Sequence, residues 1–338
     1  MTELKNAKNI KTDILIVGSG AAGLYCALKL PKEKQIVIIT KEDAESSDSF
    51  LAQGGMCVLK SEEDYDRYFE DTMRAGHYKN RKESVDIMIR SSQDIVKELI
   101  RYGVEFEQEN GKLLYTREGG HSTHRIVFHE DITGKEITSK LLAAVKKCEN
   151  VKLIEYTTMI DLLTDGTTCM GAVTVDKEDR KQVIEAGDTV LACGGLGGLY
   201  EHSTNFRHLT GDALAIALSH GIKLENIDYI QIHPTTLYSK KPGRRFLISE
   251  SVRGEGAVLL DKNGNRFVNE LLPRDLLTKE VYAQMEKDDM PYVRLSLEPI
   301  DEEEIKGHFP NIYRRCLEEG YDVTKDPIPV VPAQHYFM

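Results

Sequence analysis

Residues 13–23 read Asp13-Ile14-Leu15-Ile16-Val17-Gly18-Ser19-Gly20-Ala21-Ala22-Gly23. Four apolar residues follow a charge and end at a glycine, which predicts a buried parallel strand. The glycines are spaced G-x-G-x-x-G, and residues 22–30 carry apolar side chains at helical spacing. Strand, glycine turn and helix form the first half of a dinucleotide-binding βαβ unit. The competing interpretation is a strand-to-helix turn that binds nothing.

Each glycine of this fingerprint has its own predicted role. Gly18 permits the tight turn, Gly20 lets the backbone approach a pyrophosphate, and Gly23 lets the helix pack closely on the strand. The free N–H groups and positive dipole end of the helix then face the phosphates. The next strand, residues 36–39, ends in Thr40-Lys41-Glu42, so the ribose-binding acid usual at this strand tip is displaced to Glu42 or absent. That departure disfavours a plain NAD dehydrogenase and leaves FAD open.

Composition excludes several classes of protein. The chain has 338 residues, which allows two domains, and a formal net charge of -11, which argues against a broad nucleic-acid footprint. The N-terminal residues have no apolar signal core, and no apolar run approaches membrane-spanning length, so no membrane partner is expected. The six cysteines include no C-x-x-C pair, which argues against metal, iron–sulfur and disulfide frameworks. A reducing cytoplasm is the expected location.

The first two thirds of the chain alternate helices, strands and glycine-rich loops. Residues 46–55 are predicted to form a loop that lets a flat ring approach the backbone. Residues 117–122 read Arg117-Glu118-Gly119-Gly120-His121-Ser122, which is either a charged surface turn or a ligand-facing loop. The remaining predictions are helices at 83–102, 135–147 and 213–220, a strand at 151–155, a hairpin of 171–175 with 183–186, and a second buried strand at 189–193 that runs into Gly194 and Gly195.

The pattern changes after Gly221. Residues 232–235 are predicted to be a loop, residues 261–265 a hairpin turn, and residues 327–332 a stiff extended linker between prolines. Residues 248–257 place charges between glycines. Pro273-Arg274-Asp275 is predicted to open a helix, with proline in the first turn.

Seven motifs occur in one order along the chain. They are the fingerprint at 18–23, Ala52-Gln53-Gly54-Gly55, the loop at 117–122, Ala192-Cys193-Gly194-Gly195, His233-Pro234-Thr235, Arg253-Gly254-Glu255-Gly256-Ala257 and Pro273-Arg274-Asp275. Together they resemble the succinate dehydrogenase/fumarate reductase flavoprotein superfamily and, within it, the L-aspartate oxidase family. The resemblance implies an α/β fold, in which a Rossmann-like three-layer FAD-binding domain carries an inserted α+β capping domain.

Two details of the resemblance select the subfamily. Membrane-complex members attach FAD covalently through a histidine five residues before the glutamine of A-Q-G-G, and Asp48 stands there in this chain. The resemblance therefore implies non-covalent FAD. The loop at 117–122 resembles the aspartate oxidase loop, in which an acid faces the substrate ammonium, and a dicarboxylate without an amine has no use for that acid.

The resemblance implies an activity and its partners. L-Aspartate would give a hydride to flavin and become iminoaspartate, the first step of de novo NAD biosynthesis. Oxygen or fumarate would accept the electrons, and quinolinate synthase would consume the product. Two alternatives stay open: a fumarate reductase/succinate dehydrogenase-like flavoprotein, and a truncated, non-catalytic remnant.

The substrate residues that the resemblance implies also make chemical sense, because two carboxylates and one ammonium need cationic donors and one acid. Arg274 would clamp a carboxylate through its planar guanidinium. Glu118 would accept from the ammonium. The other implied residues are His233 and His335 on the carboxylates, Ser249 in place of a threonine donor, His121 completing the pocket, and Glu250 with Arg253 as a proton relay to Arg274 in the fumarate-reducing direction.

Simpler interpretations accompany these roles. Arg253 and Glu255 are alternatively a structural ion pair, His233 a satisfied loop histidine, and Cys193 a buried small residue rather than a redox group. The FAD-contacting residues that the resemblance implies are Gly18, Ser19, Gly20, Ala21, Ala22, Gly23, Thr40, Lys41, Ser47, Ser49, Ala52, Gln53, Gly54, Gly55, Ala192, Cys193, Gly194 and Asp212.

The domain limits follow from the same resemblance. Residues 1–226 are expected to form the FAD-binding domain, residues 227–334 the capping domain, and residues 335–338 the start of the return to the FAD domain. Family members continue past His335-Tyr336 with further FAD-contacting and substrate-binding elements. The expectation is therefore a C-terminally truncated chain with an active site between its two domains.

Overall fold

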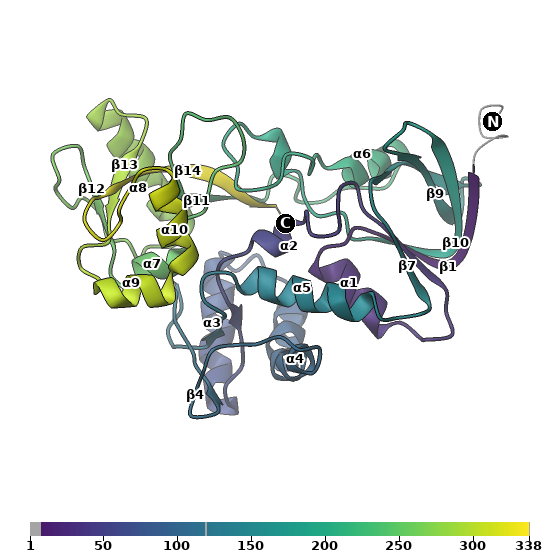
Figure 1. Cartoon of the computed structure of the whole chain (residues 1–338), viewed down its shortest axis with the longest axis horizontal. Coiled ribbons are helices and arrows are strands. Elements are labelled where there is room, and N and C mark those ends of the chain that lie inside the picture. The colour runs from purple at the N-terminus through teal and green to yellow at the C-terminus, as the bar shows by residue number, and fades with distance from the viewer. Residues whose placement is uncertain (1–7, 119, 338) are drawn as a thin grey trace.

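The computed structural model describes residues 8–118 and 120–337. Gly119, part of the predicted ligand loop, lies outside the described residues. The described residues form a six-stranded sheet and a four-stranded sheet, which lie towards opposite ends of the molecule in Figure 1, with further helices between and below them.

The six-stranded sheet contains the predicted nucleotide-binding strand at its centre. Its strand order is β7-β2-β1-β10-β9-β8. The strand β1 pairs in parallel with β2 on one side and β10 on the other, which confirms the prediction of a buried parallel strand. The bounds are β1 (Lys8–Val17), β2 (Ile36–Ile39), β7 (Val151–Ile154), β8 (Thr157–Thr164), β9 (Cys169–Asp176) and β10 (Lys181–Leu191).

Alternate residues of β1 enter different cores, because successive side chains of a strand point to opposite faces. Ile14 and Ile16 pack with α1 (Ala21–Lys29) and α5 (Thr133–Val145). Leu15 and Val17 join the core on the other face, which includes Ile216 of α6 (Asp212–Ser219). The helices α1 and α5 lie together below the sheet in Figure 1, and α6 lies above it. The predicted three-layer α/β domain is confirmed.

Two fingerprint glycines are required by close backbone contacts. Gly18 has a φ of 117°, and a Cβ there would lie 2.1 Å from the carbonyl oxygen of Ala192. A Cβ on Gly23 would lie 2.1 Å from the carbonyl oxygen of Gly18. Any side chain at Gly18 or Gly23 would therefore push the turn away from β10 or lift α1 off the turn, as the sequence predicted.

The predicted hairpin is present, but its second strand and the strand predicted after it form the single strand β10. The strand β9 pairs with β10 in antiparallel register, from Val175 opposite Lys181. Residues 183–186 and 189–193 were predicted as separate strands because Gly187 and Asp188 interrupt the apolar pattern. In the structure β10 continues through them, because it pairs with β1 from Lys8 to Val17.

A helical layer lies beneath the centre of the molecule. It contains α3 (Tyr65–Ala75) and α4 (Lys82–Arg101), and α4 confirms the helix predicted at 83–102. The predicted loop at 46–55 includes one short helix, α2 (Asp48–Leu51). The shorter elements are β3 (Met56–Cys57), η2 (Glu62–Asp64), β4 (Gln108–Glu109), β5 (Lys112–Leu113), β6 (Ile126–Val127) and η3 (Gly197–Leu199).

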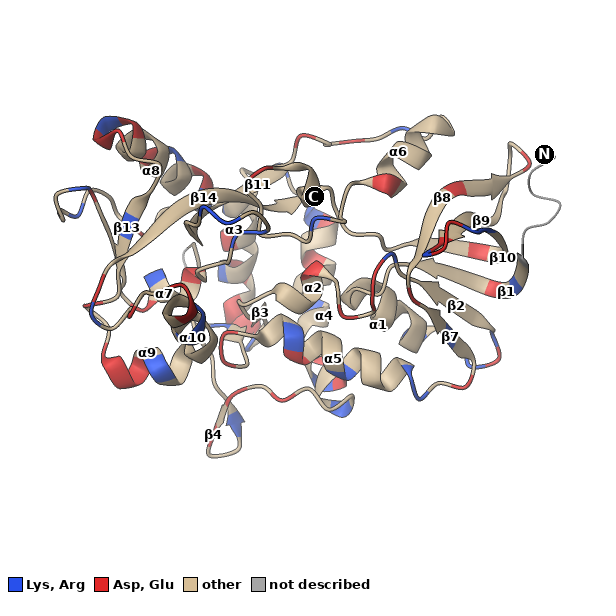
Figure 2. Ribbon diagram, turned by 45° about the horizontal axis from the view of Figure 1, so that its top comes forward, with Lys and Arg blue, Asp and Glu red and all other residues tan. Residues whose placement is uncertain are grey.

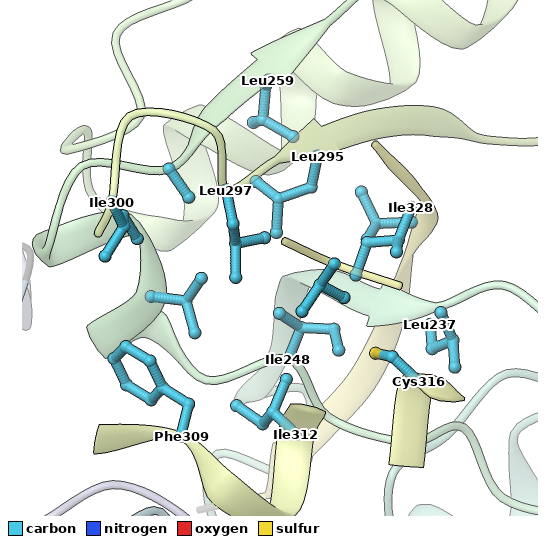
Figure 3. Close-up of a cluster of buried hydrophobic side chains, with 14 of the residues drawn as sticks. Leu237, Ile248, Leu259, Leu295, Leu297, Ile300, Phe309, Ile312, Cys316 and Ile328 are labelled. Atoms are coloured by element: carbon cyan, nitrogen blue, oxygen red, sulfur yellow. The ribbon is translucent and has the colours of Figure 1, made fainter. Parts of the chain in front are cut away.

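The four-stranded sheet has the order β11-β14-β13-β12 and its own core. Leu259 and Leu295 from two strands, Ile312 from a helix and Ile328 from the start of a third strand come together there (Figure 3). The bounds are β11 (Ile230–Leu237), α7 (Glu250–Gly254), β12 (Val258–Leu260), α8 (Arg274–Asp288), β13 (Val293–Ser296), α9 (Glu302–His308), α10 (Pro310–Glu318) and β14 (Ile328–Phe337). The helix predicted to open at Pro273-Arg274 is α8.

Two proline-containing segments were predicted wrongly. The loop at 232–235 belongs to β11, and the linker at 327–332 belongs to β14, which is an inner strand of the sheet. Proline normally disfavours an inner strand because it lacks the N–H that the ladder needs. Here Ala333 pairs with His233 and Val331 with Thr236, so Pro332 lies at a register shift where two residues of β11 stand opposite this single residue of β14.

The division at residues 226 and 227 stays a prediction, although the hydrophobic cores support it. The core in Figure 3 uses residues from Leu237 to Val330, whereas the two cores of the six-stranded sheet use residues from Ile14 to Ile216. The strand β14 pairs with β11 as far as Phe337, so His335 lies in the four-stranded sheet.

Charges of both signs are spread along the ribbon (Figure 2). Among the described residues, no helix is both long enough and apolar enough to cross a membrane.

The close approach at Gly23 generates a stability prediction. Replacing Gly23 by Ala should lower the free energy of unfolding by about 1–3 kcal/mol, because the new methyl group overlaps the Gly18 carbonyl. Gly307→Ala in α9 is the matched control, since a Cβ there meets nothing within 4 Å. Denaturant unfolding should show the control unchanged or stabilised by up to about 1 kcal/mol. Equal effects of the two substitutions would contradict the assigned role of Gly23.

Candidate active site

The start of α1 fits a phosphate group. Gly20 precedes the helix and has no side chain with which to cap it. The amide of Ala21 donates to Ser49 Oγ at 3.1 Å, so Ser49 reaches this helix end from α2. The first amides of a helix have no partner within it and carry the positive end of its dipole. Backbone N–H groups beside a glycine turn are therefore available to a pyrophosphate.

Two further predicted FAD contacts are paired with each other. Lys41 Nζ lies 2.7 Å from Asp212 Oδ2 and donates to the carbonyl of His208 at 2.9 Å. These bonds tie the tip of β2 to the start of α6. Ser19 is also engaged, because its hydroxyl donates to the carbonyl of Ala44 at 3.1 Å. Lys41, Asp212 and Ser19 therefore shape the wall of the predicted site through contacts within the protein.

Unpartnered polar atoms support a cofactor at the A-Q-G-G loop. Gln53 Oε1 and Ser47 Oγ are buried and have no hydrogen-bond partner among the described residues. Buried polar atoms normally have partners, so these two oxygens are suited to a bound ring system. A Cβ on Gly55 would lie 2.3 Å from Ile126 Cγ2, so this backbone stays bare against β6. The residues present fit FAD.

The side chains of Cys193 and Asp48 each contact the protein backbone, and burial raises the pKa of both. Cys193 Sγ lies 3.4 Å from the carbonyl of Val17, and burial raises the pKa of its thiol to about 11. A thiol that stays protonated is a poor redox nucleophile, which supports the interpretation as a small buried residue. Asp48 accepts from the amide of Phe206 at 3.0 Å, and burial raises the pKa of its carboxyl to about 6.

Three predicted residues form a charge cluster, in which Glu250 and Arg253 are buried and Arg274 is partly exposed. Arg274 Nε donates to Glu250 Oε2 at 2.5 Å, and Arg253 Nη2 lies 3.8 Å from the same oxygen. Arg253 also donates to the carbonyl of Glu270 at 2.5 Å. The ion-pair partner of Arg253 is thus Glu250, not the Glu255 that the alternative interpretation named. The sequence motifs that contain these residues lie about twenty positions apart and meet where α7 and α8 begin.

Burial and the two guanidiniums have opposite effects on the pKa of Glu250. Burial alone would raise the pKa of its carboxyl, but Arg274 and Arg253 together hold that pKa below the ordinary 4.5. Burial also lowers the pKa of Arg253, and its Nε and Nη2 have no hydrogen-bond partner among the described residues. The cluster therefore keeps donors free beside a fixed carboxylate.

The predicted histidines lie next to this cluster. The rings of His233 and His335 have centroids 5.3 Å apart and meet edge to face. Burial, with Arg274 second, lowers the pKa of His335 to about 3 and that of His233 well below 6.5, so both rings are neutral at pH 7. His233 Nδ1 contacts the backbone of Thr235, while its Nε2 is buried without a partner among the described residues.

Glu118 connects the FAD loop to α7. Its Oε1 accepts from Ser251 Oγ at 2.9 Å, and a Cβ on Gly54 would lie 3.0 Å from that oxygen. Burial, with Glu250 second, raises the pKa of the Glu118 carboxyl above 4.5. Ser249 caps α7, because its hydroxyl accepts from the amide of Ser251. Ser249 therefore reaches Glu118 through Ser251.

The loop at 117–122 faces a cavity rather than forming only a surface turn. The cavity has a volume of about 240 Å³, and its lining residues are Arg74, Arg117, Glu118, Gly120, His121, Gly254 and Leu271. Burial, followed by Arg125, lowers the pKa of His121, and its Nδ1 is buried without a partner among the described residues. This arrangement supports the interpretation as a ligand-facing loop.

A buried ion network holds this loop from α3. Arg125 is 0% exposed and pairs with Asp71 at 2.6 Å and with Asp64 at 2.9 Å. Asp71 also accepts from the amide of Ser122 at 2.8 Å. These bonds help to fix the position of Ser122 in the loop.

Sequence reasoning missed two residues of the site. Arg274 Nη1 donates to Gln231 Oε1 at 2.6 Å, and Ser251 contacts Glu118. Ser251 lies within the charged segment at 248–257, so its hydroxyl was a visible signal in the sequence. Gln231 lies two positions before His233, but the adjacent residues were interpreted as a loop, which hid the strand that brings both to the site.

Known proteins resemble this chain over most of its length. The family described as the FAD binding domain matches residues 13–338. L-Aspartate oxidase of Clostridium perfringens is 46% identical over 327 residues, which cover 96% of this chain and 74% of the relative. The chain belongs to the L-aspartate oxidase family. The L-aspartate oxidase of Clostridium acetobutylicum is 45% identical over 332 residues, which cover 98% of this chain and 76% of the relative.

A solved structure supports the wider relationship. The FrdA chain of an E. coli quinol fumarate reductase variant superposes with a TM-score of 0.90 at 27% identity, and the match covers 98% of this chain and 61% of that chain. The predicted membership in the succinate dehydrogenase/fumarate reductase flavoprotein superfamily is confirmed. This L-aspartate oxidase family member is a flavin-dependent oxidoreductase, and its cofactor is FAD.

The charge cluster generates a second prediction. Glu250→Gln should lower stability at pH 7 by about 3–5 kcal/mol, because it removes the buried carboxylate that the buried guanidinium of Arg253 and the partly exposed guanidinium of Arg274 both approach. The pKa of Glu250 is lowered, so its contribution is present above pH 4.5 and is lost as the pH falls through the folded-state value. The difference in the free energy of unfolding between wild type and Glu250→Gln should therefore become smaller at acid pH.

Urea unfolding across a pH series measures this difference. Glu255→Gln is the matched control and should change stability by less than about 0.5 kcal/mol. A larger loss for the control than for Glu250→Gln would restore the Arg253–Glu255 pair as the structural one.

Proposed function

We propose that this chain oxidises L-aspartate to iminoaspartate with non-covalently bound FAD, as the first step of de novo NAD biosynthesis. Oxygen or fumarate would accept the electrons, and quinolinate synthase would consume the product. The names of the Clostridium relatives support the substrate, and Asp48 in place of a linking histidine supports non-covalent binding. The cytoplasm, which the sequence analysis predicts, is the proposed location.

One observation carries the choice of substrate. Glu118 contacts both the FAD loop at Gly54 and the cap at Ser251, and it lines the cavity beside His121. A buried carboxylate is costly unless a positive charge accompanies it. Arg274 and Arg253 already attract this carboxylate, and a substrate ammonium would add a direct positive partner beside the FAD loop, whereas a plain dicarboxylate would add repulsion. The position of Glu118 therefore favours an amino dicarboxylate.

The remaining residues would bind and orient this substrate. Arg274 is the cationic donor for one carboxylate, held in place by Glu250 and Gln231. His233 and His335 are neutral donors for carboxylate oxygens. The raised pKa of Glu118 suits it to take a proton from the substrate ammonium, which leaves the free amine that can be oxidised. FAD, when bound, supplies the acceptor for the two electrons and the hydrogen that leave Cα.

The structural relatives support a second candidate. A TM-score of 0.90 to quinol fumarate reductase is compatible with fumarate reduction by the same cluster. In that direction Arg274 would deliver the proton, with Glu250 and Arg253 as its relay. A guanidinium with a pKa above about 12 is a weak acid, so this direction depends on the relay.

The first test is cofactor binding and turnover. The purified chain should show a flavin absorbance band near about 450 nm and should reduce that flavin when L-aspartate is added without oxygen. The flavin should separate from the protein on acid denaturation, because the attachment is non-covalent. Absence of the band after incubation with FAD would support the non-catalytic remnant instead.

The second test separates the two substrates. Glu118→Gln should lower kcat/KM for L-aspartate by about 10²–10⁴-fold and leave succinate oxidation or fumarate reduction within about threefold. Glu109→Gln on the exposed strand β4 serves as the control and should change neither reaction. An equal loss for L-aspartate and succinate would contradict an ammonium-binding Glu118.

The pH dependence provides a third test. Because the pKa of Glu118 lies above 4.5, kcat/KM for L-aspartate should fall as the pH drops through that raised value, where the carboxylate becomes neutral. This acid limb should be absent from the residual activity of Glu118→Gln. The same limb in both proteins would assign it to another group.

A further inference from the structure

Residues 202–205 hold the end of β14 from outside the four-stranded sheet. The amide of Gln334 donates to the carbonyl of His202 at 2.9 Å, and the amide of Thr204 donates to the carbonyl of Gln334 at 3.0 Å. Asn205 Nδ2 donates to the carbonyl of His335 at 2.9 Å. The backbone that carries the His335 ring is thus fixed on a segment about 130 residues earlier in the chain.

The ring of His335 has one side-chain partner in this segment. Its Nδ1 lies 2.6 Å from Thr204 Oγ1, and Thr204 is 4% exposed. The only other acceptor within reach of this hydroxyl in the described structure is the carbonyl of Gln334, at 3.5 Å. That carbonyl already accepts the amide of Thr204. The short contact to the ring is therefore the better use of the hydroxyl proton.

The charge state of the ring makes its tautomer matter. His335 is neutral at pH 7, and a neutral imidazole carries one N–H and one bare nitrogen. A substrate carboxylate only accepts hydrogen bonds. If Nδ1 carried the proton, the other nitrogen, Nε2, would present a lone pair to the carboxylate and repel it. Only the tautomer with the proton on Nε2 can bind a carboxylate.

We propose that Thr204 sets the tautomer of His335: its hydroxyl donates to Nδ1, so that Nε2 carries the proton and donates into the substrate pocket. The inference rests on the proposed function, in which His335 binds a substrate carboxylate. Thr204 acts through the ring, so it is a positioning residue for the dicarboxylate.

The neighbouring histidine shows why Thr204 is the informative residue. His233 Nδ1 lies 3.2 Å from the amide nitrogen and 3.0 Å from the carbonyl oxygen of Thr235, so its surroundings are main chain. No side-chain substitution removes those groups. At His335 the partner is one hydroxyl, which a valine of nearly the same shape deletes.

Binding of succinate, a dicarboxylate without an amine, tests the proposal. Succinate is titrated by calorimetry, without oxygen, against the FAD-loaded full chain whose flavin has been reduced beforehand, so that no oxidation of succinate follows binding. Thr204→Val should weaken succinate binding about tenfold, the loss expected for one hydrogen bond to a charged group. KM for L-aspartate should rise by a similar factor, with kcat within about threefold. Thr204→Ser keeps the hydroxyl and should restore binding to within about twofold.

A matched control excludes a general loss of packing. Thr174 lies in β9, is 0% exposed, and its hydroxyl contacts the carbonyl of Gln182 at 3.5 Å. Thr174→Val deletes a buried hydroxyl in the other sheet and should leave succinate affinity unchanged. A similar loss of affinity in Thr174→Val and Thr204→Val would overturn the specific role of Thr204.

Nitrogen NMR reads the tautomer without turnover. In ¹⁵N-histidine-labelled protein, His335 should have its proton on Nε2 in wild type and Thr204→Ser, and a mixture of tautomers in Thr204→Val. The His335 signals are assigned by their loss in His335→Gln. A proton on Nδ1 in the wild type would overturn the proposal, as would unchanged succinate affinity in Thr204→Val. Failure of wild type to oxidise L-aspartate, with the NMR and succinate results as expected, would refute the proposed substrate alone.

Discussion

The buried carboxylate of Glu250 is the interaction on which the site depends. Two guanidiniums approach one of its oxygens, and removal of Glu250 would leave the buried Arg253 without this counter-charge. Burying charges is costly, so the surrounding part of the fold must offset that cost. It does so with the hydrophobic core of the four-stranded sheet and with α7 and α8, which both begin at the cluster.

Polar contacts also join the parts of the chain that form the two sheets. They join residues before 226 to residues after 227: Ser251 with Glu118, and Asp131 with the first amides of α10. Asp131 binds the amide of Ile312 near the start of α10, although burial raises the pKa of its carboxyl. Polar contacts of this kind fix orientation more than they add stability.

The nucleotide-binding half could be predicted from sequence because its determinants are local. Gly18 and Gly23 are required by contacts within one turn and its neighbouring strand, and the apolar run at 14–17 is buried on both faces. The segments at 232–235 and 327–332 were misinterpreted because proline is a local signal, whereas the register shift that accommodates Pro332 exists only once β11 and β14 pair. Gln231, Ser251 and Thr204 act through partners far away in sequence, so no spacing pattern reveals them. The roles of Glu118, Arg274 and the histidines came from motif resemblance. The structure adds the contacts of Arg274 with Glu250, of Glu118 with Ser251 and of His233 with His335.

The position of Glu118 has a consequence for the charge of the pocket. Arg274 and Arg253 balance Glu250 and an ionised Glu118, so the four side chains sum to zero. In the proposed reaction, a proton that passes from the substrate ammonium to Glu118 moves from one group of the site to another. The total charge of substrate and side chains is then the same before and after that transfer. The proposed site would therefore change the protonation of its substrate without a change in net charge that a counter-ion has to compensate.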